Sequence, residues 1–207
     1  MIIQKNLNLV EYVGENLREF LEPTAYCESG DPEIRQLGSE ITKGKKTDTD
    51  RAKAIFEWVK ENVKYDIVPL VGAKKVIKRQ SKFAMCYDKT NLFVAICRSI
   101  GVPARYMILD CDLKVNRNDI SPKAKHIAAE VYVDGKWTLT DPSFEDEIES
   151  LIEPSKFGSP TWVSGRNIKR TKSLSRIMVF LVNTILIHLP FFKKLKQAIR
   201  EARASYA

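Results

Sequence analysis

The sequence contains few cysteines, and their positions form no metal or disulfide pattern. Cys27, Cys86, Cys97 and Cys111 are widely spaced, and no two of them make a CxxC pair. This spacing argues against a zinc site and does not indicate a disulfide framework. No other motif implies a metal or an organic cofactor, so we expect neither. Cysteines without a disulfide pattern are typical of a reducing, intracellular setting.

The N-terminus lacks the features of a secretory signal. The segment MIIQKNLNLVEYVGENL has no basic region followed by an apolar one, and its pattern is that of an amphipathic helix. We therefore expect a cytoplasmic protein. Its 207 residues, 44% of them hydrophobic and 29% charged, are enough to bury the core of one main domain.

Most of the chain has almost no net charge, although the whole chain carries +8. Residues 151–207 hold 11 lysines and arginines but only 2 acidic residues. Residues 1–150 hold 23 lysines and arginines and 24 acidic residues. A body close to neutral lacks the basic face that neutralises phosphates, so we expect no nucleic-acid partner. The sequence therefore predicts a main domain over 1–150 and a basic, helical C-terminal extension over 151–207.

Helical periodicity dominates the first hundred residues. It predicts helices over 3–22, 31–42, 47–63 and 72–80, and a further helix that begins near Cys86. Asp31 and Pro32 form a cap and first-turn pair for the second of these helices, and Asp48 or Asp50 can cap the third.

The period of the apolar residues changes to two after residue 103. Three segments read as strands: ARYMILDC (104–111), HIAAEVYV (126–133) and KWTLT (136–140). Asp134-Gly135 is a strong two-residue hairpin signal between the last two strands, and a polar loop over 112–125 separates the first two. Helices followed by an antiparallel sheet predict an α+β fold.

A cysteine at the start of the central helix suggests thiol chemistry. A helix N-terminus offers unpaired N–H groups and a partial positive charge, and both favour the thiolate, the reactive form of cysteine. A base is needed to take the proton, and histidine suits neutral pH. The chain has two histidines, His188 in an apolar C-terminal run and His126 at the start of a strand. A lone cysteine such as Cys86 is more often a small core residue, so the pattern needs further support.

The predicted hairpin brings an acidic residue towards His126. With the turn centred on 134–135, strand positions whose numbers sum to about 269 face each other, and antiparallel neighbours or near diagonals lie roughly 5–8 Å apart. Asp141 falls within about two residues of the position opposite His126. It can therefore orient the imidazole, as the third member of a triad does.

Three segments in this order resemble the transglutaminase-like superfamily of cysteine enzymes, whose core is similar to that of papain-like proteases. They are DRAKAIFEWVKENVKYD (50–66), CYDKTNLFVAICRSIGVPARYM (86–107) and HIAAEVYVDGKWTLTDPSF (126–144). The resemblance covers about residues 47–146. It implies a papain/transglutaminase-like catalytic domain over 1–150, with Cys86 as the nucleophile, His126 as the base and Asp141 as the orienting carboxylate.

Three further positions bear on this resemblance. The family usually has glycine two residues before the cysteine and often an aromatic residue two after the histidine, where this chain has Ala84 and Ala128. These departures leave all three triad members in place. Gln80, six residues before Cys86, is a candidate amide donor to an oxyanion hole beside the Cys86 N–H, with an ordinary surface glutamine as the alternative.

The C-terminal quarter carries the most apolar run of the chain. Residues 177–192, IMVFLVNTILIHLPFF, are too short to span a bilayer, and polar residues and Pro190 interrupt them. The next segment, 191–207, has a basic amphipathic pattern of a type seen at anionic membrane surfaces. Three interpretations stay open for residues 173–207: packing against the domain, association with a membrane surface, and insertion.

Three functions fit these patterns. The first is a cysteine-dependent amide hydrolase or acyltransferase that acts on protein or peptide substrates through a thioester, without a cofactor. The second is a transglutaminase-like module that has lost turnover and binds a partner. The third is a membrane-surface-associated protein that acts through its basic C-terminal helix. The intact set of Cys86, His126 and Asp141 favours the first.

Overall fold

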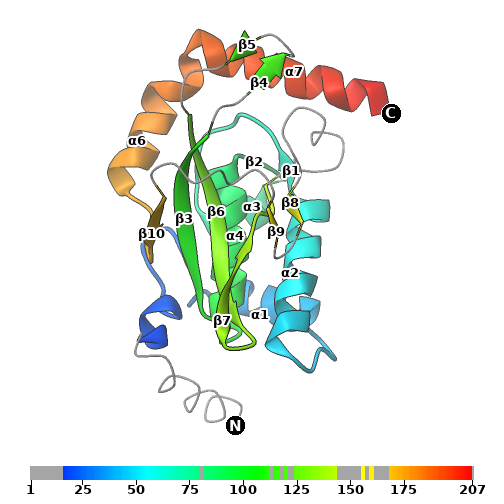
Figure 1. The fold of residues 1–207 in the computed structure, drawn as a ribbon, viewed down its shortest axis with the longest axis vertical. Coiled ribbons are helices and arrows are strands. Elements are labelled where there is room, and N and C mark those ends of the chain that lie inside the picture. Colours follow the sequence, from blue (N-terminus) through cyan, green and yellow to red (C-terminus); the bar gives the residue numbers. More distant parts are fainter. Residues whose placement is uncertain are drawn as a thin grey trace.

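The computed structural model describes residues 16–79, 82–111, 114–116, 119–120, 124–143, 155–156, 159–160 and 168–206. A central helix, α4 (Cys86–Ser99), is surrounded on one side by three helices: α1 (Pro32–Ile41), α2 (Asp48–Asn62) and α3 (Ala73–Lys78). A four-stranded antiparallel sheet packs against the same central helix (Figure 1). The predicted α+β fold is confirmed.

The helices expected in residues 31–100 are present, with small shifts of their ends. α1 begins after Asp31, whose side chain accepts a hydrogen bond from the Glu33 amide, as predicted. The prediction of Asp48 or Asp50 as the cap of α2 is wrong. Thr47 accepts the Asp50 amide at 3.0 Å and donates its hydroxyl to the Asp50 carboxylate, so the preceding residue satisfies the free amide.

The helix expected over 3–22 does not extend through the part of this segment that the structure describes. Residues 1–15 lie outside that part, and Leu17–Phe20 form a short 3-10 helix, η2. Leu17 and Phe20 are buried beside Tyr132 and Trp137, so this turn packs its apolar residues on the sheet instead of continuing as an α-helix.

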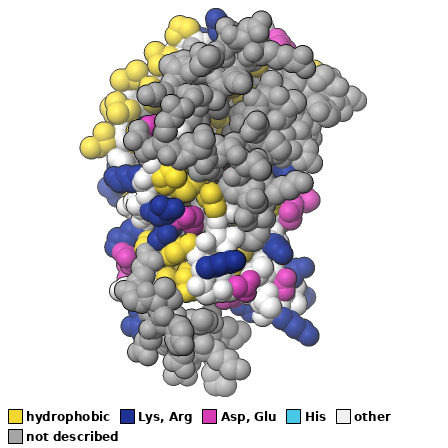
Figure 2. All heavy atoms as spheres, in the orientation of Figure 1, with side chains coloured by type: hydrophobic (Ala, Val, Ile, Leu, Met, Phe, Trp, Pro, Cys, Tyr) yellow, Lys and Arg dark blue, Asp and Glu magenta, His cyan; other side chains and the backbone are white. Residues whose placement is uncertain are grey.

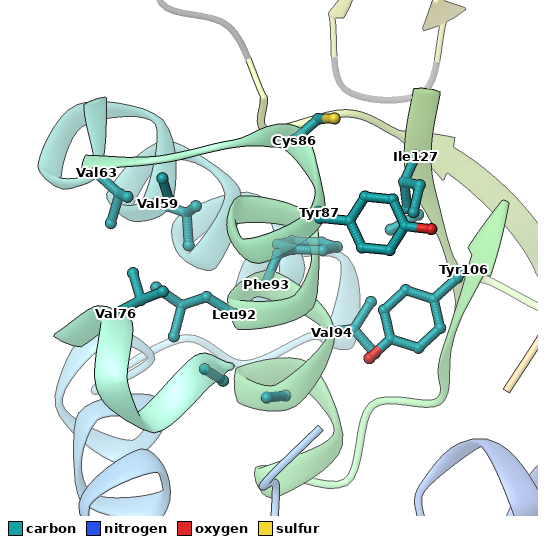
Figure 3. Close-up of a cluster of buried hydrophobic side chains, with 14 of the residues drawn as sticks. Val59, Val63, Val76, Cys86, Tyr87, Leu92, Phe93, Val94, Tyr106 and Ile127 are labelled. Carbon is teal, nitrogen blue, oxygen red and sulfur yellow. The ribbon is translucent and has the colours of Figure 1, made fainter. Parts of the chain in front are cut away.

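The core is built around α4, which is buried from Cys86 to Arg98. Figure 3 shows part of the apolar cluster that surrounds it. Val59 of α2 and Val76 of α3 approach one side, and Ile127 from the sheet approaches another. Burial on several sides explains why residues 92–97 of this helix are all apolar.

The main sheet has the strand order β10-β3-β6-β7. Its strands are β3 (Ala104–Cys111), β6 (Ala124–Val133), β7 (Lys136–Thr140) and β10 (Lys169–Thr171). Val133 pairs with Lys136 and Ala129 pairs with Thr140, which is the register that the hairpin predicted. Asp134 and Gly135 have φ values of 51° and 76°, as a tight two-residue turn of this kind requires.

Short strand pairs lie beside the main sheet. β1 (Lys64–Tyr65) runs parallel to β2 (Phe83–Ala84), just before the central helix. β4 (Lys114–Asn116) and β5 (Asp119–Ile120) occupy part of the expected polar loop over 112–125, and β8 (Ser155–Lys156) pairs with β9 (Ser159–Pro160). β6 also begins two residues earlier than predicted, because Ala124 and Lys125 continue its pairing with β3.

The segment expected to form a separate extension contributes to the main sheet. β10 pairs with β3 and was not predicted from the sequence. Leu174 and Val179 also belong to the same apolar core as the residues of α2 and α4. The division near residue 150 stays a prediction, and the two segments it separates share one sheet and one core.

The C-terminal residues form α6 (Arg176–Thr184), a short 3-10 helix η3 (Leu186–His188) and α7 (Pro190–Tyr206), which cross one end of the molecule (Figure 1). Buried side chains from α6 and α7 join the core: Val179, Val182, Leu195 and Ile199. Packing against the domain, one of the three interpretations, is thus present in the structure.

Within the described part of the chain, no single helix is long and apolar enough to cross a bilayer. The segments Arg176–His188 and Phe192–Glu201 meet that criterion of length and composition only as a pair bent by 74°.

Candidate active site

Cys86 is the first residue of α4. Met85 before it has extended backbone, and the first hydrogen bond of the helix runs from the Lys89 amide to the Met85 carbonyl at 2.9 Å. The amides of Cys86, Tyr87 and Asp88 therefore have no acceptor inside the helix, and the helix dipole adds a partial positive charge there. Cys86 belongs to the apolar cluster, and Figure 3 shows its sulfur directed away from Leu92. The free amides and the positive end of the helix dipole therefore lie where the thiol is attached.

His126 and Asp141 form a buried hydrogen-bonded pair. Nε2 of His126 lies 2.6 Å from Oδ2 of Asp141, and the two residues expose 4% and 1% of their surfaces. The second oxygen of the carboxylate accepts the Ser143 amide at 2.9 Å. Since Asp141 engages Nε2, Nδ1 is the ring nitrogen that is left to meet a thiol.

The Cys86 side chain is hydrogen-bonded to the His126 ring. Burial by itself lowers the pKa of His126, but the Asp141 carboxylate and the contact with Cys86 outweigh burial and raise this pKa to about 10. A histidine with this pKa holds its second proton at neutral pH. The resulting positive charge on the ring lies beside the sulfur.

The structure therefore brings together the three residues that were predicted as a triad. The hairpin register sets the distance from His126 to Asp141, and the packing of α4 on β6 sets the approach of Cys86 to His126. Their catalytic roles stay a prediction. Sequence reasoning did not identify Ser143 as a residue that fixes the carboxylate, although a turn residue two positions after an aspartate often donates its amide in this way.

Asp88, in the first turn of α4, supports the helix that carries the thiol. Its carboxylate accepts the amides of Val71 at 2.8 Å and Gly72 at 3.2 Å. Burial raises the pKa of Asp88 to about 6, while these two hydrogen bonds oppose the increase. Asp88 thereby ties the segment before α3 to the start of α4.

Cys27 and Cys97 lie in settings that disfavour reactivity. Cys27 and Cys97 are fully buried, and burial raises the pKa of both thiols. The side chain of Cys111 lies outside the described part of the structure. Cys86 is therefore distinguished from the two described buried thiols by its helix start and its histidine neighbour.

The candidate oxyanion donor Gln80 lies outside the described residues, so that role stays a prediction.

Ala84 and Ala128, the two departures from the family pattern, both lie in packed positions. Ala84 is buried in β2, and its carbonyl accepts the Asp66 amide at 3.1 Å. Ala128 is buried with Met107 and Leu109 in a small apolar cluster.

No group of three or more histidine, cysteine or acidic side chains suited to a metal ion is found in the described ranges. A thiol that contacts an imidazole, which in turn contacts a carboxylate, is an arrangement suited to nucleophilic covalent chemistry.

Comparisons with known proteins identify the family and the fold. The family model described as the transglutaminase-like superfamily matches residues 35–142, a little more than half of the chain. A search of curated proteins gives no match. Among solved structures, a candidate cysteine protease from Cytophaga hutchinsonii is 23% identical, with a TM-score of 0.55, and the match covers 79% of this chain and 55% of that one. The periplasmic domain of TgpA from Pseudomonas aeruginosa is 14% identical, with a TM-score of 0.52, over 68% of this chain and 52% of that domain.

At these identities the two structures show the fold alone. This chain spans about half the length of each. The predicted papain/transglutaminase-like core is confirmed by the family match and by these neighbours. The chain belongs to the transglutaminase-like superfamily.

Proposed function

We propose that this protein is a thiol enzyme that hydrolyses or transfers acyl groups at amide bonds of proteins or peptides. Cys86 is the nucleophile, His126 the acid and base, and Asp141 the orienting carboxylate. The observation that carries the proposal is the continuous set of contacts from the Cys86 thiol through the His126 ring to Asp141. Membership of a superfamily of cysteine enzymes supports an enzyme in general.

In the first half-reaction the Cys86 sulfur attacks the carbonyl carbon of the amide, and the carbonyl electron pair moves to oxygen. The proton held by His126 passes to the nitrogen of the leaving amine as the C–N bond breaks, and a thioester remains on Cys86. Asp141 keeps the ring oriented and stabilises its charged form.

In the second half-reaction His126 takes a proton from water or from a second amine, which attacks the thioester. The C–S bond breaks, and the sulfur returns to its thiolate state beside the protonated ring. Water as the acceptor gives hydrolysis, whereas an amine gives transfer. The Cys86 amide, which has no acceptor within α4, is suited to stabilise the oxyanion in both halves, with Gln80 as the proposed second donor.

A second candidate is a binding module without turnover. The observation that favours it is burial, because Cys86 exposes 5% and His126 exposes 4% of their surfaces. A protein substrate reaches such a thiol only if neighbouring segments move aside. The packed alanines at positions 84 and 128, where the family pattern differs, are consistent with this candidate.

An activated ester separates the two candidates, because it is small and needs no specific recognition. The full chain incubated with p-nitrophenyl acetate should release nitrophenol and gain an acetyl group that peptide mapping places on Cys86. Cys86→Ala should lose the adduct, whereas Cys97→Ala, which removes a buried thiol from the same helix, should keep it. A folded parent protein that gains no adduct at Cys86 would refute the enzyme and favour the binding module.

A further inference from the structure

The segment formed by α6 and η3 is apolar on two sides. Its inner side packs on the domain through Val179 and Val182, which are buried. Its outer side exposes five large apolar side chains, with exposed fractions between 37% and 73%: Ile177, Phe180, Leu181, Ile185 and Leu189. A helix surface with several large apolar side chains is normally covered by another part of the protein or by a partner.

These five side chains are named here the outer strip. Ile177, Phe180 and Leu181 lie within α6 at a spacing of three or four residues, which places them on the same side of the helix. Ile185 follows the end of α6, and Leu189 follows the end of η3. Figure 2 shows hydrophobic side chains gathered over the position of α6 at the upper left edge of the molecule. Scattered apolar residues are ordinary on a surface, whereas a contiguous patch of this kind marks an interaction site.

Along the sequence, the segment that contains the outer strip carries charge of a single sign. From Pro154 to Arg200 the sequence contains ten lysines and arginines and no aspartate or glutamate. Arg176 lies at one end of the strip, Lys193 and Lys194 lie at the other, and all three are exposed. An apolar strip between cations is complementary to a bilayer surface with acidic headgroups, which is apolar below and anionic above.

A second copy of the chain fits this surface less well than lipid does. A symmetric dimer through the outer strip would bring the cations of both copies together at its margins, and like charges facing each other oppose association. An anionic lipid surface supplies the opposite charge instead.

We propose that the outer strip docks on an anionic lipid surface, with α6 and η3 lying in the headgroup region. Docking needs no unfolding of the domain, because the inner side stays in place. Asn183 remains hydrogen-bonded to the backbone of Leu70, and Lys196 donates to the Ile67 carbonyl at 3.0 Å. The proposal does not depend on catalysis.

Sedimentation of the full chain with vesicles tests this proposal. We expect binding to phosphatidylcholine vesicles that contain phosphatidylserine and much weaker binding to phosphatidylcholine alone. Binding should weaken about tenfold as salt rises from about 0.1 M to about 1 M, because the Debye length falls from about 10 Å to about 3 Å.

Two variants and one control separate the apolar and charged contributions. Ile177→Ser with Phe180→Ser should weaken binding at least about tenfold, and so should Lys193→Glu with Lys194→Glu. Lys43→Glu with Lys45→Glu makes the same charge change at exposed positions after α1 and should leave binding unchanged. Thermal melts of each variant show that the fold is retained.

Two results would overturn the proposal. One is a parent protein that does not bind vesicles of either composition, and the other is binding that survives the substitution of Ile177 and Phe180 by serine. If the parent protein does not bind vesicles and forms a dimer in light scattering that the same two substitutions dissociate, the outer strip is assigned to a second copy.

Discussion

Thr90, one turn along α4 from Cys86, donates a hydrogen bond of 2.9 Å to the carbonyl oxygen of Ile127, the residue after His126. Thr90 and Ile127 are both fully buried. This bond joins the helix that carries the thiol to the strand that carries the histidine. The approach of Cys86 to His126 therefore depends on a contact that neither residue makes.

Replacing Thr90 by valine keeps the shape of the side chain and removes the donor. We expect the free energy of unfolding to fall by about 1 kcal/mol, the usual net contribution of one buried hydrogen bond. We also expect kcat for ester cleavage to fall by up to about a hundredfold with KM little changed, since a misplacement of about 1 Å between reacting groups has an effect of that size.

The matched control for this change is Thr140→Val. Thr140 is equally buried, but its hydroxyl has no hydrogen-bond partner in the part of the chain that the structure describes. Its removal should leave the free energy of unfolding unchanged or raise it. Equal losses of stability in the two variants would show that the Thr90 bond contributes nothing specific.

The proton on His126 should make stability depend on pH in the alkaline range. Burial lowers the pKa of His126, and Asp141 and Cys86 raise it by more, to about 10 in the folded protein. Because this value lies above the ordinary 6.5, the stabilisation is fully present below about pH 6.5 and is lost as pH rises through about 10.

Asp141→Asn removes the main group that raises this pKa. We expect the difference in unfolding free energy between parent and Asp141→Asn to be widest below about pH 6.5 and to narrow towards pH 10. Urea denaturation at several pH values measures this difference. Both proteins carry Cys86→Ala, so that the Cys86 thiol does not contribute to the pH dependence. A difference that is constant across this range would mean that His126 is not charged in the folded protein.

The parts of the site that follow from sequence are those governed by local rules. The Asp134-Gly135 turn sets the register of β6 and β7, and this register alone brings Asp141 near His126. The start of α4 at Cys86 follows from helical periodicity. By contrast, β10 and the Thr90 bond depend on contacts between distant segments, which no local pattern encodes.

Arg98 is a clear example of a contact that sequence patterns do not reveal. Its buried guanidinium donates four hydrogen bonds of 2.8–2.9 Å to three backbone carbonyls, those of Glu22, Ala104 and Lys172. The three carbonyls come from the segment before α1, the start of β3 and the segment after β10. One side chain therefore joins three parts of the chain that are far apart in sequence.

Arg98→Lys keeps the positive charge and removes the planar fork of donors. We expect the free energy of unfolding to fall by about 2–4 kcal/mol, because buried carbonyls and a buried charge lose their partners. Arg51→Lys is the matched control, since Arg51 makes a partly exposed pair with Asp48 and should change stability by no more than about 0.5 kcal/mol. Similar effects at both positions would contradict the structural role of Arg98.

Cys86 should be the first of the described thiols to react with iodoacetamide. Its sulfur lies at a helix start beside a charged histidine, whereas Cys27 and Cys97 are fully buried with a raised pKa. We expect Cys86 to be modified at least about tenfold faster in the native protein, as measured by peptide mapping of partly labelled samples. His126→Ala should slow the labelling of Cys86 and leave the other two rates unchanged. Labelling of Cys86 after both buried thiols would rule out its assignment as the nucleophile.

Asn183 of α6 accepts the Leu70 amide at 2.7 Å and donates to the Leu70 carbonyl at 3.0 Å. Leu70 is followed by Val71 and Gly72, whose amides bind Asp88 at the start of α4. α6 is therefore connected through one short segment to α4, the helix that carries Cys86.

Asn183→Ala leaves both backbone groups of Leu70 without this partner. We expect the free energy of unfolding to fall by about 2–3 kcal/mol. We also expect the amides of Val71 and Gly72 to exchange hydrogen faster, because the residue before them loses both of its hydrogen bonds to Asn183. The control is Thr184→Ala, since the exposed Thr184 hydroxyl donates to the Phe180 carbonyl of its own helix and its loss should change the free energy of unfolding by about 0.5 kcal/mol or less. If both variants were as stable as the parent, α6 would not hold this segment, and the start of α4 would be ordered by Asp88 without help from the C-terminal helices.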